Sequence, residues 1–371
     1  MNLYDKFSEL NIDIASLTVK KQQTDYKIKY VSEYIRVWAI ISAERKEVKD
    51  ISFIDCMCNA GVYADGDCCT AIEVLRIFIE IANNHKEKNF HLYLNDFDYD
   101  KIKFLNSVLN LVYDVELENL KIHIDNKDVN VYLDSLVKNS NIFGMGRSVV
   151  LYIDPFDFGT VIIPKVTEVL KKNYCEVIFN FFSSDYSRNI RNDKERIKKC
   201  IGGLSIKNKE EIIEYIQKQL KVGSIKYLFS YEFKTRKNVE LYQIIFVTPS
   251  SKGLEKLKDV LWKVFDGKEF HRNEDETGQL SFFTTEDEKE LRAKEYATEA
   301  KRMLLKKYSG EKVSYSTIEI YLIENTMLRE GQIIKYVIKP MIDEGILTKN
   351  GETRNSSNYK KDTYTVGGFN E

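Results

Sequence analysis

The sequence has 371 residues, a length that favours two or three folding units over one compact domain. Apolar residues make up 43% and aromatic residues 12%, enough to bury a sizeable core. The charged residues make up 30% but cancel to a net charge of −1, which excludes a global attraction to nucleic acid or to anionic membranes. Only four prolines and 17 glycines occur, which disfavours a disordered or repetitive chain.

The first 20 residues mix polar and apolar side chains, so they do not resemble a signal peptide. No apolar run reaches the ~18 residues needed to cross a bilayer. We therefore expect a soluble, cytoplasmic protein with no membrane partner. The cysteines are spaced as C-x-C followed by an adjacent pair, unlike the usual zinc ligands, so we expect reduced structural thiols and no metal. The six cysteines are Cys56, Cys58, Cys68, Cys69, Cys175 and Cys200.

Residues 1–50 form an N-terminal helical segment in our interpretation, because an apolar face recurs with helical spacing over 27–43. Strands and helices then alternate, which indicates βαβ units in a mostly parallel α/β sheet with helices on both faces. We predict strands at 51–55, 90–94, 121–124, 148–153 and 176–182. We predict helices at 70–83, 99–111, 129–139 and 164–171.

Residues 185–223 are charged and helical, and 225–233 with 240–248 form an antiparallel hairpin that closes the sheet. The Rossmann-like domain therefore spans 51–267. The polar stretch 268–287 marks a boundary, and 286–371 forms a second domain. Its order of helix, turn, helix and two short strands is typical of a winged-helix-like module.

Ligands of open parallel sheets bind at the carboxyl ends of the strands, and acidic residues stand at those ends here. Asp55 ends the first strand and is followed by a turn that contains Asn59 and Gly61. Asn59 takes the place of a first glycine, and asparagine tolerates a left-handed backbone better than most residues. We predict a cofactor-binding loop, and an ordinary strand–turn–helix corner is the alternative.

Asp96 follows the second strand, where a carboxylate can accept hydrogen bonds from both ribose hydroxyls. Asp98 precedes a helix, and we assign it to the N-cap. Asp125, with Asn126 beside it, ends the third strand and is placed to meet an adenine amino group. Turn chemistry explains Asp125 equally well.

Asp154, Pro155 and Phe156 follow a buried strand. Proline ends the strand, the carboxylate lies at the edge of the sheet, and the aromatic ring can stack on a base. We predict that these three residues are catalytic. The alternative is a strand-ending turn in which Phe156 and Phe158 belong to the core.

Together these motifs resemble the three-Cys-motif partner proteins (TcmP), a bacterial and phage-associated family with a class I methyltransferase-like Rossmann domain. The motifs that carry the resemblance are FIDCMCNAGVYADG at 53–66, LNDFD at 94–98, YIDPFDFG at 152–159 and LKDVLWKVFDG at 257–267. The sequence departs from the family pattern at 57–60 and at Asp157.

The resemblance implies S-adenosylmethionine as cofactor and methyl transfer as activity, with a role in phage–host conflict. It places Asp55, Asn59 and Gly61 in the cofactor loop, Asp96 at the ribose and Asp125 near the adenine. Asp154-Pro155-Phe156 is also similar to the motif with which related amino-methyltransferases hold a target amine, although the second proline is missing.

The last part of the chain carries a local excess of basic residues, which suits contacts with DNA or RNA phosphates. These residues are Lys335, Lys339, Lys349, Arg354, Lys360 and Lys361. We therefore predict a methyltransferase-like protein that acts on nucleic acid. Two alternatives stay open: a non-catalytic nucleotide-binding or partner-binding protein with a degenerate cofactor loop, and Mg²⁺-dependent nucleotide hydrolysis by the strand-end acids.

Overall fold

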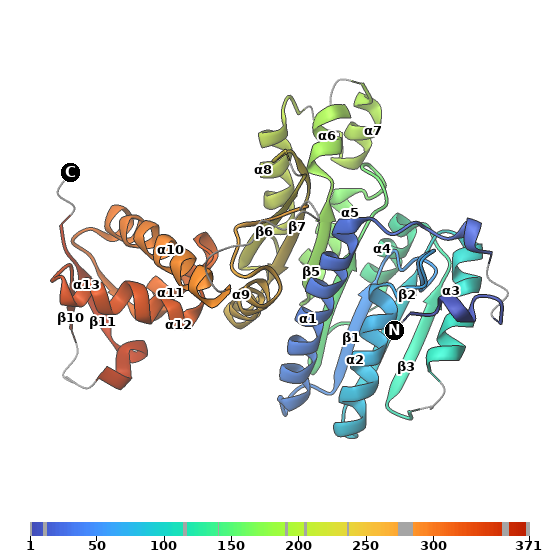
Figure 1. Ribbon diagram of the computed structural model, residues 1–371, viewed down its shortest axis with the longest axis horizontal. Helices are drawn as coiled ribbons and strands as arrows, with labels where there is room; N and C mark the ends of the chain where they lie inside the picture. Colours follow the sequence, from blue (N-terminus) through green and yellow to red (C-terminus); the bar gives the residue numbers. More distant parts are fainter. Residues whose placement is uncertain are drawn as a thin grey trace. The chain divides into compact units, whose positions relative to one another are not determined.

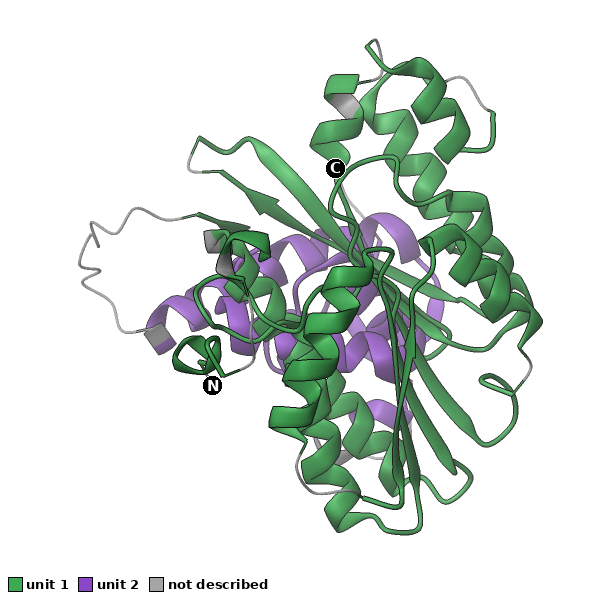
Figure 2. Ribbon diagram, turned by 90° about the vertical axis from the view of Figure 1, so that its right-hand side faces the viewer, with its two compact units in different colours: residues 1–250, 270–274 green, residues 251–269, 275–371 purple. Residues whose placement is uncertain are grey.

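The computed structural model shows two compact units, traced in Figure 1 and coloured separately in Figure 2. It describes residues 2–9, 13–113, 117–139, 141–189, 192–203, 206–235, 237–273, 285–350 and 356–368. The first unit comprises Met1–Ser250 with Phe270–Glu274, and the second comprises Ser251–Glu269 with Asp275–Glu371. The helix at Ser251–Phe265 thus belongs to the second unit, whereas the sequence analysis placed it in the Rossmann-like domain.

An eight-stranded sheet forms the centre of the first unit, in the order β3-β2-β1-β4-β5-β7-β6-β8. Strands β1 to β5 are parallel, and β7 is inserted antiparallel between β5 and β6. The strands are β1 (Asp50–Asp55), β2 (Asn89–Asn95), β3 (Leu120–Asp125), β4 (Arg147–Ile153), β5 (Glu176–Phe181), β6 (Tyr227–Lys234), β7 (Glu240–Thr248) and β8 (Phe270–Arg272). This strand order, with β7 reversed, is that of the Rossmann-like class I methyltransferase fold.

Helices cover the sheet of the first unit. They are α1 (Gln22–Glu44), α2 (Thr70–Asn84), α3 (Tyr99–Val112), α4 (Val129–Lys138), α5 (Ile163–Lys172), α6 (Ser183–Asn189), α7 (Lys194–Cys200) and α8 (Lys209–Leu220). Helices α1 and α2 lie side by side in front of β1 in Figure 1. Helix α1 packs on the sheet: the Tyr34 hydroxyl donates to Glu176 Oε2 at 2.6 Å, and the Tyr34 ring contacts Phe246.

Two central strands are buried along nearly their whole length, which explains why 148–153 and 176–182 read as continuous apolar runs. On the face opposite α1, Leu151 and Phe179 belong to a core that includes Val166 of α5 and Ile216 of α8. The expected strands and helices of 51–182 begin and end within two residues of the observed ones.

The charged, helical stretch predicted over 185–223 consists of three helices, the first of which begins at Ser183. Asp193 caps α7 by accepting from the Arg196 N–H, and Asn208 caps α8 by accepting from the Glu211 N–H. Each cap starts a new helix because its side chain satisfies a free backbone donor. The edge strand β8 and the helix at Ser251–Phe265 were not predicted.

The second unit has a three-stranded antiparallel sheet in the order β10-β11-β9. Its elements are α9 (Ser251–Phe265), α10 (Thr285–Tyr308), β9 (Lys312–Ser314), α11 (Tyr315–Asn325), α12 (Glu330–Gln332), the π-helical η3 (Ile333–Ile338), α13 (Lys339–Asp343), β10 (Leu347–Lys349), the 3₁₀-helical η4 (Ser356–Lys361) and β11 (Thr363–Val366). The π-helical turn precedes Pro340, which has no N–H to donate to the preceding turn. Helix α9 is fastened by a hydrogen bond of 2.6 Å from Trp262 Nε1 to the Met327 carbonyl.

Among the residues that the structure describes, no helix is both long and apolar enough to cross a membrane.

Candidate functional site

Four aspartates stand where β1, β2, β3 and β4 end, at one edge of the sheet, which we call the carboxyl edge. Asp55 and Asp125 are the last residues of β1 and β3, and Asp96 and Asp154 directly follow β2 and β4. Burial raises the pKa of Asp55 well above its usual value, and the charges of Asp154 and Asp96 raise it further. Four carboxyl groups therefore gather at this edge, and burial favours the neutral form of Asp55.

The loop after β1, residues 56–69, folds back onto the end of β2. Asn59 adopts a left-handed backbone with φ of 61°, so the substitution for glycine is accommodated. Its N–H donates to Asp96 Oδ2 at 2.9 Å, and the Cys58 N–H donates to the Asn95 carbonyl at 2.8 Å. Two hydrogen bonds thus fasten this loop to β2.

Gly61 lies where the same loop meets α3. Its φ is 84°, and a Cβ atom at this position would lie 3.1 Å from Leu105 Cδ1 and 3.4 Å from Val108 Cβ. A larger residue would therefore be strained and crowded, which explains glycine here.

Asp96 is only 3% exposed, and both of its carboxylate oxygens accept backbone hydrogen bonds. Oδ2 accepts from the Asn59 N–H, and Oδ1 accepts from the Asp98 N–H at 3.0 Å. Asp98 caps α3, as predicted, by accepting from the N–H groups of Asp100 and Lys101. Asp96 therefore anchors the loop, and each of its carboxylate oxygens keeps one lone pair for a further donor such as a ribose hydroxyl.

Asp125, the last residue of β3, and Asn126 after it are more exposed than Asp96. The Asp125 carboxylate pairs with Lys127 at 2.5 Å. The Asn126 side chain donates to the carbonyls of Asp96 and Phe97, both at 2.9 Å. Asn126 thus stabilises the turn after β2, and the Asp125 carboxylate stays near the surface.

Asp154 accepts three hydrogen bonds. Lys27 Nζ of α1 and the Tyr152 hydroxyl approach Oδ2 at 2.6 Å and 3.1 Å, and Asn180 Nδ2 approaches Oδ1 at 2.7 Å. The carboxylate can only accept, so the amide nitrogen of Asn180 must face it and Oδ1 must point elsewhere. Asn180 is 1% exposed, and its Oδ1 has no hydrogen-bond partner.

Pro155 is buried beside Asp154, and Phe158 lies in the core at 7% exposure. Phe156 does not lie in the core: its ring is 49% exposed, and Lys101 Nζ lies 4.0 Å from the ring centroid. The loop thus presents an aromatic ring at the carboxyl edge.

Several residues at this edge escaped the sequence analysis. Lys27 and Asn180 lie on α1 and β5, far in sequence from Asp154, and no local pattern marks them. Phe97 and Tyr99 are 75% and 69% exposed directly beside Asp96 and Asp98. The alternation of aspartate and aromatic residues over 96–100 is the sequence pattern that could have indicated these exposed rings.

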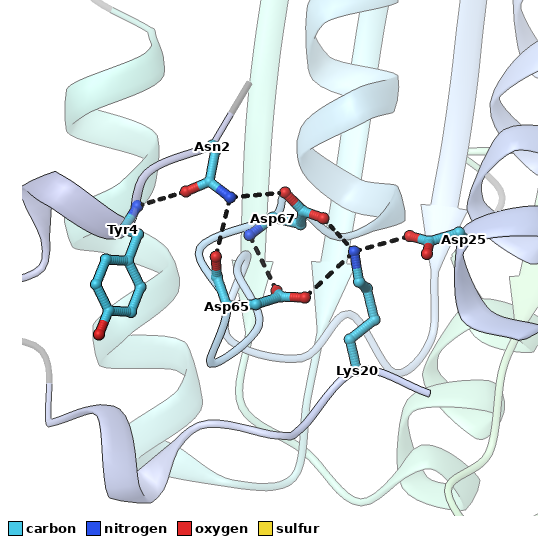
Figure 3. A network of polar contacts seen from close by, with 6 residues as sticks. All are labelled: Asn2, Tyr4, Lys20, Asp25, Asp65 and Asp67. Atoms are coloured by element: carbon cyan, nitrogen blue, oxygen red, sulfur yellow. Dashed lines mark hydrogen bonds and ion pairs between the residues drawn. The ribbon is translucent and has the colours of Figure 1, made fainter. Parts of the chain in front are cut away.

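The N-terminal segment covers the outer part of the loop, as Figure 3 shows. Lys20 Nζ lies between three carboxylates: it pairs with Asp25 at 2.8 Å, with Asp65 at 3.3 Å, and with Asp67. The Asn2 side chain donates to Asp67 Oδ1 and to the Asp65 carbonyl, both at 2.9 Å. The hydrogen bonds and ion pairs of residues 2–4 and 20 therefore stabilise the position of residues 65–67 in the loop.

The hydrogen-bond acceptors at the carboxyl edge suit a cationic adenosyl group better than a nucleotide. Asp55 Oδ1 accepts a hydrogen bond from the Met57 N–H at 3.1 Å, and within the described residues the buried Oδ1 atoms of Asn59 and Asn180 have no donor. An ammonium group would satisfy such acceptors, whereas phosphates would be repelled. The residues therefore fit S-adenosylmethionine in charge.

No group of three or more His, Cys, Asp or Glu residues within the described ranges is placed to hold a metal ion. All six cysteines are buried thiols, and none forms a disulfide in the described part of the chain. Burial raises the pKa of Cys56 and Cys58, which keeps these thiols protonated.

The basic residues of the second unit do not form one continuous surface of free charge. Lys349 pairs with Asp362 at 2.8 Å, and Lys360 pairs with Glu330. Lys335 lines a hollow of about 570 Å³ that also contains three acids of α10. Those acids are Glu286, Asp287 and Glu290. Lys339 and Lys361 are exposed, and Arg354 lies outside the described residues.

No protein-family model matches the sequence, and no curated protein sequence matches it. Among solved structures, protein LPL1258 from Legionella pneumophila is 10% identical, with a TM-score of 0.38 over 64% of this chain and 93% of that chain. A SAM-dependent methyltransferase from Methanosarcina mazei is 14% identical, with a TM-score of 0.28 over 56% and 95%. Human methyltransferase-like protein 13 in complex with SAH is 11% identical, with a TM-score of 0.32 over 69% and 97%. These similarities are weak, so the fold of the first unit is assigned from the strand order of its own sheet.

Proposed function

We propose that the first unit is an S-adenosylmethionine-dependent methyltransferase whose cofactor and substrate meet at the carboxyl edge. The observation that carries this proposal is the row of aspartates at the ends of β1, β2, β3 and β4, in a sheet with the class I methyltransferase strand order. Ligands of open α/β sheets bind at this edge.

Charge selects this cofactor over a nucleotide. S-adenosylmethionine carries a sulfonium and an ammonium group and no phosphate. Asp55 and Asn59 Oδ1 would hold the ammonium group, and Asp125 would lie on the adenine side. When bound, the cofactor supplies an electrophilic methyl group on sulfur.

Asp154 would position the atom that receives the methyl group. Its carboxylate accepts from Lys27, Tyr152 and Asn180, so it is held in one orientation. A substrate amine would replace Lys27 Nζ at Oδ2 and be oriented there. Phe156 offers an exposed aromatic face beside it.

Isothermal titration calorimetry with S-adenosylmethionine and S-adenosylhomocysteine tests the cofactor. We expect tighter binding of S-adenosylmethionine, because only that ligand carries the sulfonium charge. We also expect proton release on binding, because a cation beside Asp55 lowers a pKa that burial and neighbouring acids had raised. The heat will then depend on the ionisation enthalpy of the buffer. Absence of binding at millimolar ligand would refute the proposal.

The Asp154→Ala variant separates binding from methyl transfer. It removes the edge carboxylate and leaves the loop of 56–69 intact, so cofactor affinity should persist while methyl transfer to protein, DNA or RNA is lost. Cofactor binding by the unchanged protein without transfer to any acceptor would favour a non-catalytic binding protein. The engagement of both Asp96 oxygens by backbone N–H groups is the observation that favours this second candidate.

Three finer predictions accompany the proposal: membership of the three-Cys-motif partner family with its role in phage–host conflict, a winged-helix arrangement of the second unit, and nucleic-acid binding by that unit. The last can be tested with a Lys339→Ala/Lys361→Ala double variant. If the second unit binds phosphates, the affinity of the double variant for a DNA or RNA duplex should be lower than that of the unchanged protein, and its affinity should depend less steeply on salt concentration. Unchanged affinity would count against a nucleic-acid contact at these lysines.

A further inference from the structure

We propose that the substrate received at the carboxyl edge is a lysine-rich segment of a protein rather than a nucleic acid. This inference rests on the proposed function, because it names the substrate class of the same site. Four observations from the first unit support it: the charge of the edge, the unsatisfied acceptor on Asn180, and the two ways in which the chain's own lysines already bind there.

The edge carries an excess of negative charge. The segments at the ends of β2, β3 and β4, residues 95–101, 125–130 and 154–160, contain seven aspartates and two lysines. Three of these aspartates pair with a cation: Asp125 with Lys127, Asp154 with Lys27 and Asp157 with Arg196. A polyanion would be repelled from such a surface, whereas a cationic segment would be attracted to it.

The unsatisfied atom beside Asp154 is an acceptor. Asn180 Oδ1 is buried without a hydrogen-bond partner, and the amide nitrogen of the same side chain is held by Asp154 Oδ1. A buried acceptor without a donor is costly, so a ligand that brings an N–H donor gains the difference. An ammonium group has three such donors.

Lys27 shows that the Asp154 carboxylate binds an alkylammonium group. Its Nζ atom lies 2.6 Å from Asp154 Oδ2, and the Lys27 side chain is 13% exposed. Lys27 thus occupies the position that a substrate lysine would take. The incoming lysine must displace it, and the Lys27→Met variant should therefore bind such a substrate more tightly than the unchanged protein.

Lys101 shows the second mode of binding. Its Nζ atom lies 4.0 Å from the centroid of the exposed Phe156 ring. Phe97 and Tyr99 present two further exposed rings next to Asp98 and Asp100. An aromatic face flanked by carboxylates binds an alkylammonium group through its ring and its charge together.

Fluorescence anisotropy with the full-length protein tests the inference. The probes are a labelled lysine-rich peptide, the same peptide with acetylated lysines, and a labelled single-stranded RNA. We expect the lysine-rich peptide to bind best, acetylation to abolish binding, and added salt to weaken it. Preferential binding of the RNA, or equal binding of the acetylated peptide, would overturn the inference.

Surface variants locate the binding. Phe97→Ala and Phe156→Ala should each weaken peptide binding about two- to fivefold, the value of an exposed cation–π contact. Asp100→Asn should weaken it and reduce its salt dependence. Tyr174→Ala is the matched control, because Tyr174 is an exposed ring (55%) next to the opposite, amino-terminal end of β5. Peptide binding that responds equally to all these variants would place the contact elsewhere.

These measurements use no cofactor, so their outcome is independent of the calorimetry with S-adenosylmethionine. Cofactor binding without peptide binding would refute only the substrate class. Peptide binding without cofactor binding would refute the methyltransferase and leave an edge that binds basic proteins. The thermal unfolding midpoint of each variant serves to exclude loss of folding as the cause of lost binding.

Discussion

Replacing Gly66 by alanine should detach the N-terminal segment from the loop that follows β1. Gly66 has a φ of 83°, and a Cβ atom there would lie 2.4 Å from Tyr4 N and 2.7 Å from Tyr4 Cα. Backbone atoms cannot swing aside as a flexible side chain can. The hydrogen bond of 2.7 Å from the Leu3 N–H to the Gly66 carbonyl should therefore break.

The size of the effect has two parts. Alanine in a left-handed conformation costs about 1–2 kcal/mol relative to glycine. Leu3 is fully buried, and exposing it costs a further ~1.5–3 kcal/mol. Gly203→Ala supplies the matched control, because Gly203 has a φ of 89° and no atom within 4 Å of the added Cβ. The control should show only the first part, so the two variants should differ by about 2 kcal/mol.

Urea unfolding gives the two free energies, and hydrogen–deuterium exchange gives the location. We expect 2–9 to lose protection in Gly66→Ala and to keep it in Gly203→Ala, with the central strands protected in both. If the two variants are equally stable and 2–9 stays protected in both, the segment does not hold the loop and the reasoning fails.

Three further predictions concern buried polar groups. Tyr34→Phe should cost about 1–3 kcal/mol in urea unfolding, because it removes a donor from the buried Glu176. Most of this cost should vanish in a Glu176→Leu background, where no polar partner for the Tyr34 hydroxyl is left. Because the pKa of Asp55 is raised in the folded protein, this group stabilises the fold below its unfolded pKa, and the contribution is lost as pH rises through the folded pKa. The Asp55→Asn variant should therefore be more stable than the unchanged protein at neutral pH, and its thermal unfolding midpoint should depend less on pH. All six thiols should be unreactive toward Ellman's reagent in the native protein at neutral pH and fully reactive in denaturant, because all are buried; rapid native labelling of Cys56 or Cys58 would contradict this burial.

The fold of the first unit was largely predictable because its parallel strands are buried on both faces. Such strands read as short apolar runs, and polar turns separate them from amphipathic helices. The short edge strand β8, Phe270–Arg272, was missed because three residues are too few to show the alternation of apolar and polar side chains that marks a strand. The three helices of 185–223 merged in the prediction, since their caps at Asp193 and Asn208 lie within uniformly charged sequence.

The candidate site was predictable only as far as it follows from strand ends. Asp55, Asp96, Asp125 and Asp154 could be placed at one edge because parallel strands end together. The partners of these acids could not, since Lys27 arrives from α1 and Asn180 from β5 through tertiary packing. The sequence also could not reveal that the Asp96 carboxylate accepts a hydrogen bond from the Asn59 N–H, because this contact depends on how the loop of 56–69 folds back onto β2.

Binding at the carboxyl edge therefore combines an exchange of partners with the filling of vacant acceptors. At Asp154 a ligand would replace Lys27 Nζ, so that contact substitutes for an internal one. Such exchanges contribute little net free energy, because donors and acceptors are paired before and after. The buried Oδ1 atoms of Asn59 and Asn180 differ, since neither has a partner to lose. These two amides should accordingly determine affinity more than the aspartates beside them, with Asn59 acting on the cofactor and Asn180 on the substrate.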